Sequence, residues 1–171
     1  TLVLPKADTV PDVVTGGRII SGFVRGIGDE YFSLGINPTY SLERFREAHD
    51  LIIRSWTEDG PFHHEGKHYE VRYANIWPRP LQQPHPPVWV ACSNRDTIHL
   101  AAQLGLGALT FAFTDPEEAK LWVDDYYTTL KNECVPLTEA VNPNIAMVTS
   151  FSVHDDPEEA DRRGKEGFQF F

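Results

Sequence analysis

The hydrophobic and polar positions of the chain alternate between two patterns. Short apolar runs rich in β-branched and aromatic residues, typical of buried strands, cover residues 18–24, 88–92, 108–113 and 145–153. A segment with apolar residues at helical spacing follows each run. Strands that alternate with amphipathic helices are typical of parallel βα units. The pattern therefore predicts four βα units, and residues 2–4 are expected to be the remnant of a further strand.

The predicted helices begin at recognisable capping residues. Ser41 is the expected N-cap of the first helix, which should end at Asp59-Gly60. The helix after residues 88–92 should end at Gly105. The pentapeptide Asp-Pro-Glu-Glu-Ala stands at 115–119 and again at 156–160. Each copy supplies an N-cap, a proline at the first helical position and acids near the positive end of the dipole, so each predicts a helix start.

Residues 58–87 are predicted to be a hairpin and a connector within one domain that spans residues 1–171. Glu65-Gly66 is the expected turn, and residues 67–73 form the return strand. The proline-rich stretch 78–87 is too rigid and irregular for a core element.

Four or five parallel strands fit either an open doubly wound sheet or part of a (β/α)₈ barrel. No G-x-G-x-x-G motif follows a strand, because residues 25–30 carry only two of the three glycines, and this disfavours a dinucleotide-binding fold. A complete barrel usually needs about 250 residues. If the 171-residue chain is a barrel, we expect a substantial part to be missing, with both ends cut.

Charge and composition argue against several classes of partner and site. The chain has 25 acidic and 15 basic side chains and a net charge of −10, which argues against a nucleic-acid partner or an anionic membrane surface. No apolar run approaches the roughly 20 residues of a membrane span, so we expect no membrane segment. With only two cysteines, neither a disulfide scaffold nor a zinc cluster is expected. These features favour a cytoplasmic protein.

Functional residues are expected after the strands, because sites in parallel α/β proteins gather at the carboxyl ends of strands. Arg25 follows the first strand and carries a planar, always-charged group suited to a phosphate. Ser93 and Thr97 flank a helix N-terminus, where hydroxyls, amides and the dipole favour an anion. The three residues predict a phosphate site. In the alternative, Arg25 pairs with Asp29 or Glu30 and Ser93 is only an N-cap.

Other chemistry is less favoured. The histidines of residues 63–68 lie across a turn without the i, i+4 spacing of a helical metal site, so we expect exposed hairpin polarity and no metal. Cys92 ends a strand, and a buried small residue is a better interpretation than a reactive thiol. Ser93 lacks the G-x-S-x-G context of a nucleophile. Trp77 is a candidate to line a pocket, although tryptophans first indicate packing.

Several segments together resemble the bacterial-luciferase-like flavin-dependent monooxygenases. Their order and spacing over residues 14–107 carry the resemblance. The matching segments are Gly16-Gly17-Arg18, Gly22-Phe23-Val24-Arg25-Gly26, Glu43-Arg44-Phe45-Arg46-Glu47-Ala48, Trp56-Thr57-Glu58, Glu65-Gly66-Lys67-His68-Tyr69, Pro78-Arg79-Pro80-Leu81-Gln82, Pro84-His85-Pro86-Pro87-Val88-Trp89-Val90-Ala91 and Ala101-Ala102-Gln103-Leu104-Gly105.

The resemblance implies an incomplete (β/α)₈ TIM barrel, with about the third to seventh strands present and most of the helix between Leu4 and Asp12 missing. Arg25, Ser93 and Thr97 would then hold the flavin phosphate, with the strand-end residues Val24 and Cys92 beside the cofactor. Cys92 stands where the family often has glycine.

Family members use reduced FMN and O₂, usually with a separate flavin reductase, and some relatives use a deazaflavin for hydride transfer. The resemblance thus implies a monooxygenase acting on a small organic substrate as a homodimer. A deazaflavin-dependent dehydrogenase and a flavin-binding relative without turnover are the alternatives. Asp29, Glu30 and Tyr31 are candidates for the pocket wall or a proton donor, and no catalytic residue is assigned.

Overall fold

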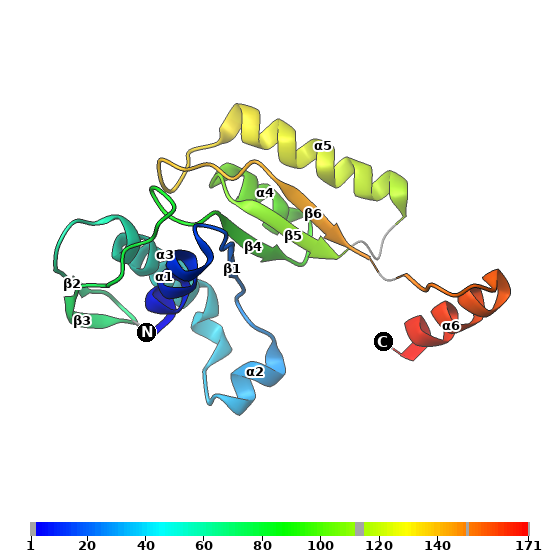
Figure 1. Cartoon of the computed structure of the whole chain (residues 1–171), viewed down its shortest axis with the longest axis horizontal. Coiled ribbons are helices and arrows are strands. Elements are labelled where there is room, and N and C mark those ends of the chain that lie inside the picture. Colours follow the sequence, from blue (N-terminus) through cyan, green and yellow to red (C-terminus); the bar gives the residue numbers. More distant parts are fainter. Residues whose placement is uncertain (1–2, 112–114, 150, 171) are drawn as a thin grey trace.

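The computed structural model describes residues 3–111, 115–149 and 151–170 (Figure 1). The helices are α1 (Val3–Thr15), α2 (Gly28–Ser33), α3 (Ser41–Thr57), α4 (Arg95–Gln103), α5 (Pro116–Glu133) and α6 (Pro157–Phe170), with a 3₁₀ turn at Pro38–Tyr40. The strands are β1 (Ser21–Phe23), β2 (Phe62–Glu65), β3 (Glu70–Ala74), β4 (Val88–Cys92), β5 (Gly107–Phe111) and β6 (Ile145–Val148).

Four strands form one parallel sheet in the order β1-β4-β5-β6. Phe23 pairs with Val90, and Cys92 pairs with Thr110, so the carboxyl ends of β1, β4 and β5 lie at one edge of the sheet. β2 and β3 form a separate antiparallel pair. The predicted parallel βα architecture is therefore confirmed, and the hairpin lies outside the main sheet.

Helices cover one face of the parallel sheet. The core packs side chains of α3, α4 and α5 against the strand residues that point toward them. Its fully buried members include Ile98, Ala102, Ala108 and Tyr126. The Tyr126 hydroxyl donates to the carbonyl oxygen of Leu106 at 2.8 Å, which satisfies the only polar atom of that side chain inside the core.

The beginning of the chain differs from the sequence prediction. Val3 and Leu4 begin helix α1 and do not belong to a strand, and the helix expected to be missing before Asp12 is present. The side chain of Asp12 is buried and accepts hydrogen bonds from the backbone N–H groups of Leu81 and Gln82, at 2.8 and 3.0 Å. Asp8 accepts a 2.9 Å hydrogen bond from the Ser21 hydroxyl. These contacts with residues far along the chain stabilise α1. The helix could not be predicted from the three apolar residues 2–4, because local propensity does not include such contacts.

Two further segments differ in length or type. β1 and β6 are shorter than the apolar runs 18–24 and 145–153 in which they lie. Helix α2 was not expected after β1, where Gly26 has a positive φ of 95° that suits glycine. In contrast, the start of α5 is as predicted, because Asp115 Oδ1 accepts from the N–H groups of Glu117 and Glu118, both at 2.9 Å.

The carboxylate of Glu47 on α3 holds the hairpin. It accepts hydrogen bonds from the backbone N–H groups of His68 and Tyr69, at 2.9 and 2.8 Å, and lies 3.3 Å from His64 Nε2. A Cβ atom at Gly66 would lie 1.9 Å from Glu47 Oε1. The predicted turn therefore needs glycine at this position because of a close approach, not because of its φ.

Gly66→Ala is expected to lower the free energy of unfolding by about 1–3 kcal/mol, because the added methyl group displaces the Glu47 carboxylate from its backbone donors. Gly28→Ala is the matched control, since nothing lies within 4 Å of a Cβ at Gly28. Urea denaturation of both variants would check the difference, and equal midpoints would contradict it.

Candidate functional site

The carboxyl edge of the parallel sheet carries the candidate phosphate site. Continuing the pairing of Phe23 with Val90 places Arg25 level with Cys92, so the segments after β1 and β4 lie side by side. Arg25 is exposed, and its guanidinium group has no hydrogen bond or ion pair within the described residues. The alternative in which Arg25 pairs with Asp29 or Glu30 is therefore wrong. A free guanidinium group at this edge is available to an anion.

Helix α2 shapes the loop that carries Arg25. The Tyr31 hydroxyl donates to the backbone carbonyl oxygen of Arg25, and Glu30 Oε2 accepts from the N–H of Ile27 at 3.0 Å. Both side chains thus bond to the backbone of the turn around Gly26. They lie next to the candidate phosphate site, and their catalytic role stays a prediction.

The N-terminus of α4 is capped by Asn94. Asn94 Oδ1 accepts from the N–H of Thr97 at 3.0 Å, and the Thr97 hydroxyl donates to the Asn94 carbonyl oxygen at 2.8 Å. The expectation that Ser93 is only an N-cap is wrong, because the neighbouring Asn94 takes that position. The Ser93 hydroxyl is exposed and has no hydrogen-bond partner in the part of the chain that the structure describes. Ser93 is therefore free to bind a ligand, whereas Thr97 supports the cap.

Cys92 is buried in the core beneath this edge. Its Sγ atom lies 3.4 Å from the Thr97 carbonyl oxygen, and burial raises the pKa of the thiol to about 11. Most of the side chain therefore faces α4, which fits the interpretation as a buried small residue. The expected proximity of Cys92 to a cofactor stays a prediction.

Cys92 is expected to react far more slowly with iodoacetamide than the half-buried Cys134, because at neutral pH a thiol of pKa about 11 is about one part in ten thousand thiolate. Mass spectrometry of the native chain over time would check this. Unfolding in urea is the control, since it should equalise the two rates. Faster labelling of Cys92 in the native chain would contradict the burial.

Two of the three hairpin histidines lie against carboxylates of α3. His64 Nε2 lies 3.3 Å from Glu47, and His68 Nε2 lies 3.1 Å from Glu43. Among the described residues, no group of three or more His, Cys, Asp or Glu side chains is placed to hold a metal ion. Trp77, the candidate to line a pocket, donates its indole N–H to Asn75 Oδ1 at 3.0 Å and lines neither cavity described below.

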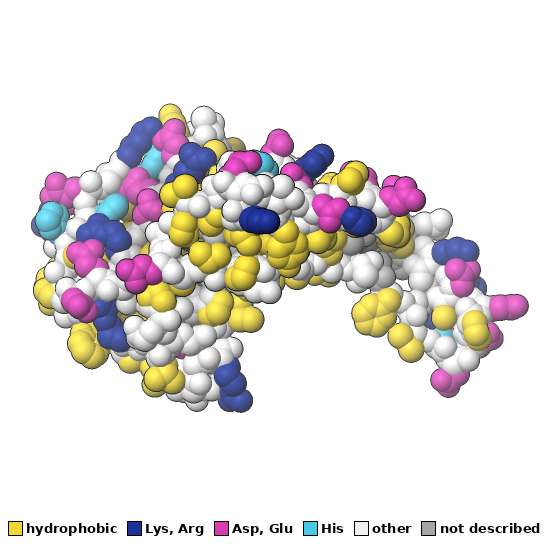
Figure 2. Space-filling view, turned by 90° about the horizontal axis from the view of Figure 1, so that it is seen from above, with side chains coloured by type: hydrophobic (Ala, Val, Ile, Leu, Met, Phe, Trp, Pro, Cys, Tyr) yellow, Lys and Arg dark blue, Asp and Glu magenta, His cyan; other side chains and the backbone are white. Residues whose placement is uncertain are grey.

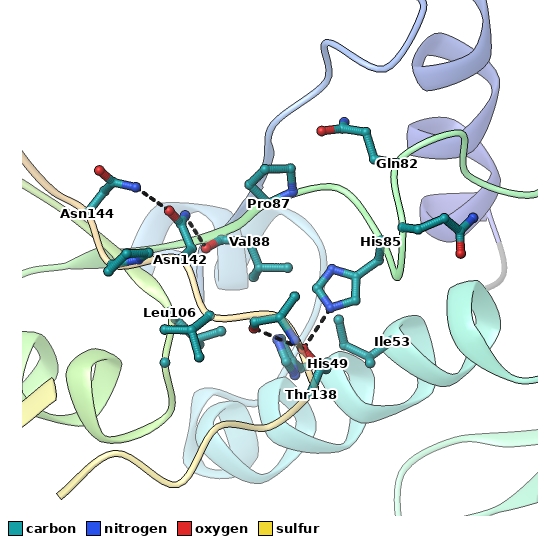
Figure 3. Close-up of a pocket in the computed structure, with 15 residues that line it drawn as sticks. His49, Ile53, Gln82, His85, Pro87, Val88, Leu106, Thr138, Asn142 and Asn144 are labelled. Carbon is teal, nitrogen blue, oxygen red and sulfur yellow. Dashed lines mark hydrogen bonds between the residues drawn. The ribbon is translucent and has the colours of Figure 1, made fainter. Parts of the chain in front are cut away.

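A cavity that the sequence did not predict lies at the opposite, amino edge of the sheet (Figure 3). It measures about 300 Å³ and lies between α3, the connector and the segment before β6. His85 Nε2 and the Thr138 hydroxyl form a 2.8 Å hydrogen bond. His49 Nε2 is buried and has no hydrogen-bond partner among the described residues. Burial lowers the pKa of His49. In the sequence, only the position of His49 on the apolar face of α3 indicated that this histidine would be buried.

A second, more open and more apolar hollow of about 830 Å³ lies at the carboxyl edge, between the ends of β5 and β6 and helix α6. Phe111, Val148, Phe151 and Phe168 are among the residues that line it. It lies at the same edge of the sheet as Arg25.

No helix in the described part of the chain is long and apolar enough to cross a membrane.

The parallel sheet, with free cationic and hydroxyl groups at its carboxyl edge, defines an α/β barrel protein of which this chain is a part. The chain belongs to the luciferase-like monooxygenase family, which it matches over residues 10–169. Both the resemblance and the incomplete (β/α)₈ barrel are thereby confirmed. The parallel sheet of the described residues has four strands, and the strand expected at residues 2–4 is not among them because Val3 and Leu4 are helical.

Two curated relatives are flavin-dependent monooxygenases. The chain is 27% identical over 153 residues to the oxygenase component of the flavin-dependent trigonelline monooxygenase of Acinetobacter baylyi. This alignment covers 87% of this chain and 41% of that protein. It is 31% identical over 100 residues to the FMNH₂-dependent dimethylsulfone monooxygenase of Pseudomonas putida, which covers 54% of this chain and 26% of that protein.

The crystal structure of monooxygenase RslO1 from Streptomyces bottropensis superposes with a TM-score of 0.80 and 26% identity over 98% of this chain and 51% of that chain. The chain therefore spans about half or less of the length of these relatives.

Proposed function

We propose that this chain is part of a flavin-dependent monooxygenase that uses reduced FMN and O₂ to oxidise a small organic substrate. The free guanidinium group of Arg25, beside the N-terminus of α4, is the observation that carries the proposal. Its support from the relatives is that they include an FMNH₂-dependent monooxygenase and an enzyme described as an oxygenase component. The second description also supports a separate reductase as the source of reduced FMN.

The residues at the carboxyl edge fit a phosphate monoester. A doubly charged phosphate needs a cation and several hydrogen-bond donors, and Arg25, the Ser93 hydroxyl and the first N–H groups of α4 provide them. Thr97 contributes by fixing the capping turn through Asn94. Val24 and Cys92 would contact the cofactor through the backbone at the strand ends, because the Cys92 side chain faces the core.

Bound reduced flavin would supply the electrons for the reaction with O₂. The chain would hold the cofactor through its phosphate, with Arg25, the Ser93 hydroxyl and the first N–H groups of α4 as donors. The apolar side chains around the hollow between β5, β6 and α6 would offer an apolar surface to an organic substrate at this edge. Glu30 and Tyr31, on the loop of Arg25, are the proposed proton donors or pocket wall.

The net charge of −10 makes a local cation important for this function. An acidic surface repels an anionic cofactor in bulk solution. The free Arg25 is a cation at the edge where the cofactor would bind.

Titration of FMN into the purified chain, followed by O₂ uptake with a flavin reductase and NADH, tests the proposal. We expect FMN fluorescence to change on binding and the chain to alter the rate of O₂ consumption beyond that of the reductase alone. Binding without any effect on O₂ consumption would contradict monooxygenase activity in this chain and favour a flavin-binding role. Absence of FMN binding would contradict the flavin site itself.

A deazaflavin-dependent dehydrogenase is the second candidate. The chain is 30% identical over 108 residues to an F420-dependent glucose-6-phosphate dehydrogenase of Microbacterium testaceum, covering 61% of this chain and 31% of that protein. The phosphate of F420 is a diester with a single negative charge, to which Arg25 could also donate. Parallel titrations with FMN and F420 distinguish them, since tighter binding of F420 would favour hydride transfer.

A further inference from the structure

The cavity at the amino edge of the sheet contains a buried histidine with one unpaired ring nitrogen. His49 is 4% exposed, and its Nδ1 atom lies 3.9 Å from the carboxylate of Asp50. Its Nε2 atom has no hydrogen-bond partner in the part of the chain that the structure describes. A neutral imidazole carries one N–H and one lone pair, so the N–H belongs at Nδ1, facing Asp50, and the lone pair at Nε2. This form can stay buried, because an unpaired acceptor costs far less than an unpaired charged donor.

Aromatic rings pack against His49 and offer no strong acceptor. The ring centroid of Phe23 on β1 lies 5.1 Å from that of His49, and the centroid of Phe45 on α3 lies 6.5 Å away. A proton added at Nε2 would therefore create a buried, positively charged N–H without an acceptor among the described residues. Protonation of His49 is incompatible with burial of its ring.

Two titratable groups act on His49. Asp50, the next residue of α3, favours a positive ring, whereas His85 on the connector disfavours it, because two imidazolium rings repel each other. Arg54 and Arg79 lie on the same two elements but are bound at the end of α3. None of the described residues that line the cavity is Asp, Glu, Lys or Arg. Burial is the largest influence and lowers the pKa of His49.

The second imidazole of the cavity, His85, can keep its hydrogen bonds when it takes up a proton. Its Nδ1 atom lies 2.8 Å from the Pro86 carbonyl oxygen and must carry N–H, and its Nε2 atom lies 2.8 Å from the Thr138 hydroxyl. In the neutral ring, Thr138 donates to Nε2. In the cation, Nε2 donates to Thr138, whose hydroxyl donates to the Ala140 carbonyl oxygen, 3.1 Å away. His85 therefore connects the residues before β4 to those before β6 in both forms.

Residues 138–144 form one wall of the cavity (Figure 3). They belong to no helix or strand, and none of them is fully buried. The bond of Thr138 to His85 holds one end of this wall, and the Asn142 N–H donates to the Gly105 carbonyl oxygen at 2.9 Å. A segment with few buried groups opens locally at low cost. The cavity of about 300 Å³ beside it gives entering water a place next to the His49 ring.

This cavity lies on the helical side of the sheet. Ile53, Val88 and Leu106 line it and belong to the core between the sheet and helices α3, α4 and α5. It differs from the hollow beside α6, which Figure 2 shows as an open gap between that helix and the body of the molecule. Further strands of a barrel would adjoin β1 and β6, whereas the walls of this cavity come from the described elements.

We propose that His49 is an acid sensor: a proton on its ring opens the wall formed by residues 138–144, so that water enters the cavity and solvates the ring. The open form takes up the proton near the ordinary histidine pKa of about 6.5, whereas the closed form has a lowered pKa and resists it. The wall is therefore closed above about pH 6.5 and opens progressively as the pH falls below that value. The wall leads directly into β6, so acid should loosen this edge of the sheet first. The device needs no flavin and does not rest on the proposed function.

Amide hydrogen exchange, followed by NMR on the whole chain without flavin, tests the proposal. The reporters are the N–H of Asn142 and the N–H of Ala108, which donates to the Asn144 carbonyl oxygen at 2.9 Å. Their protection factors should fall about 3–5-fold between pH 6.5 and 5.5, the change that uptake of one proton by a histidine gives. Amides in the interior of α5 should keep their protection. Unchanged protection at the reporters, or an equal fall in α5, would overturn the proposal.

Three variants identify the sensor. His49→Leu should abolish the pH dependence, because leucine is apolar and takes up no proton. His154→Leu is the matched control, since His154 is exposed before α6 and its loss should leave the dependence intact. Thr138→Val removes the bond to His85 and should lower protection about fivefold at both pH values with the same pH dependence. A His49→Leu chain with the pH dependence of the wild type would assign the effect to another group and refute the proposal.

The ring nitrogens of His49 give a second measurement that needs no variant. Long-range ¹⁵N NMR at pH 7 should show a neutral ring with its proton at Nδ1. The ring should remain neutral at pH 6, where a histidine of ordinary pKa is mostly charged. A proton at Nε2 at pH 7, or a ring already charged at pH 6 while Asn142 is still protected, would overturn the proposal even if His49→Leu does not fold.

Discussion

Asp12→Ala is expected to lower the free energy of unfolding by about 2–4 kcal/mol, because it removes a buried carboxylate and leaves its part-buried donors without their acceptor. The carboxylate of Asp12 is 0% exposed and accepts from the N–H groups of Leu81 and Gln82 and from the Gln82 side chain at 2.8 Å. Urea denaturation at neutral pH measures the loss. Asp59→Ala is the control, since Asp59 is fully exposed and its substitution should change stability by less than about 0.5 kcal/mol.

The same carboxylate should make stability depend on pH. Burial pushes the pKa of Asp12 upward, but the hydrogen bonds from Gln82 and Leu81 outweigh burial and leave the pKa below its usual value. The stabilisation is therefore complete above the unfolded-state pKa of about 4 and is lost as pH falls through the lower pKa of the folded state. Asp12→Asn should remove this acid-side part of the pH dependence. An unchanged acid profile in Asp12→Asn would show that other carboxylates cause it.

Arg25→Ala is expected to weaken FMN binding by about 100-fold, while riboflavin binding changes little. A guanidinium group that binds a phosphate through charged hydrogen bonds contributes about 3 kcal/mol, and riboflavin has no phosphate. Fluorescence titration of both ligands measures the two ratios. Arg72→Ala is the matched control, because Arg72 is an exposed arginine on β3, away from the carboxyl edge. Equal losses for FMN and riboflavin would refute the role of Arg25.

Local chemistry in the sequence predicts part of the fold. The start of α5 follows from Asp115 and Pro116, because a cap acts within one turn. Helix α1 could not be predicted in the same way, since Asp12 finds its partners at Leu81 and Gln82, far along the chain. Helix α2 was not predicted, because the glycines in and around it are typical of a loop.

The candidate site, like the fold, could be predicted from the sequence only in part. The place of Arg25 and Ser93 follows from the rule that parallel strands end at one edge, and the structure brings their segments together. The choice of Asn94 over Ser93 as the cap could not be made from the sequence, because either residue type serves as an N-cap. The cavity around His49 depends on the packing of three distant segments, and no local pattern predicts it.

The pairing of β1 with β4 has a consequence for the order of folding. These neighbours in the sheet are separated by residues 24–87, whereas β4, β5 and α4 follow one another closely. Closing a loop of that length costs about 4 kcal/mol of chain entropy, so β1 should join the sheet late and leave it early. The bonds of Asp8 to Ser21 and of Asp12 to Gln82 connect α1 to both ends of this loop and offset that cost. Pulse-labelled amide exchange during refolding would detect the order, with protection in β4 and β5 preceding protection in β1.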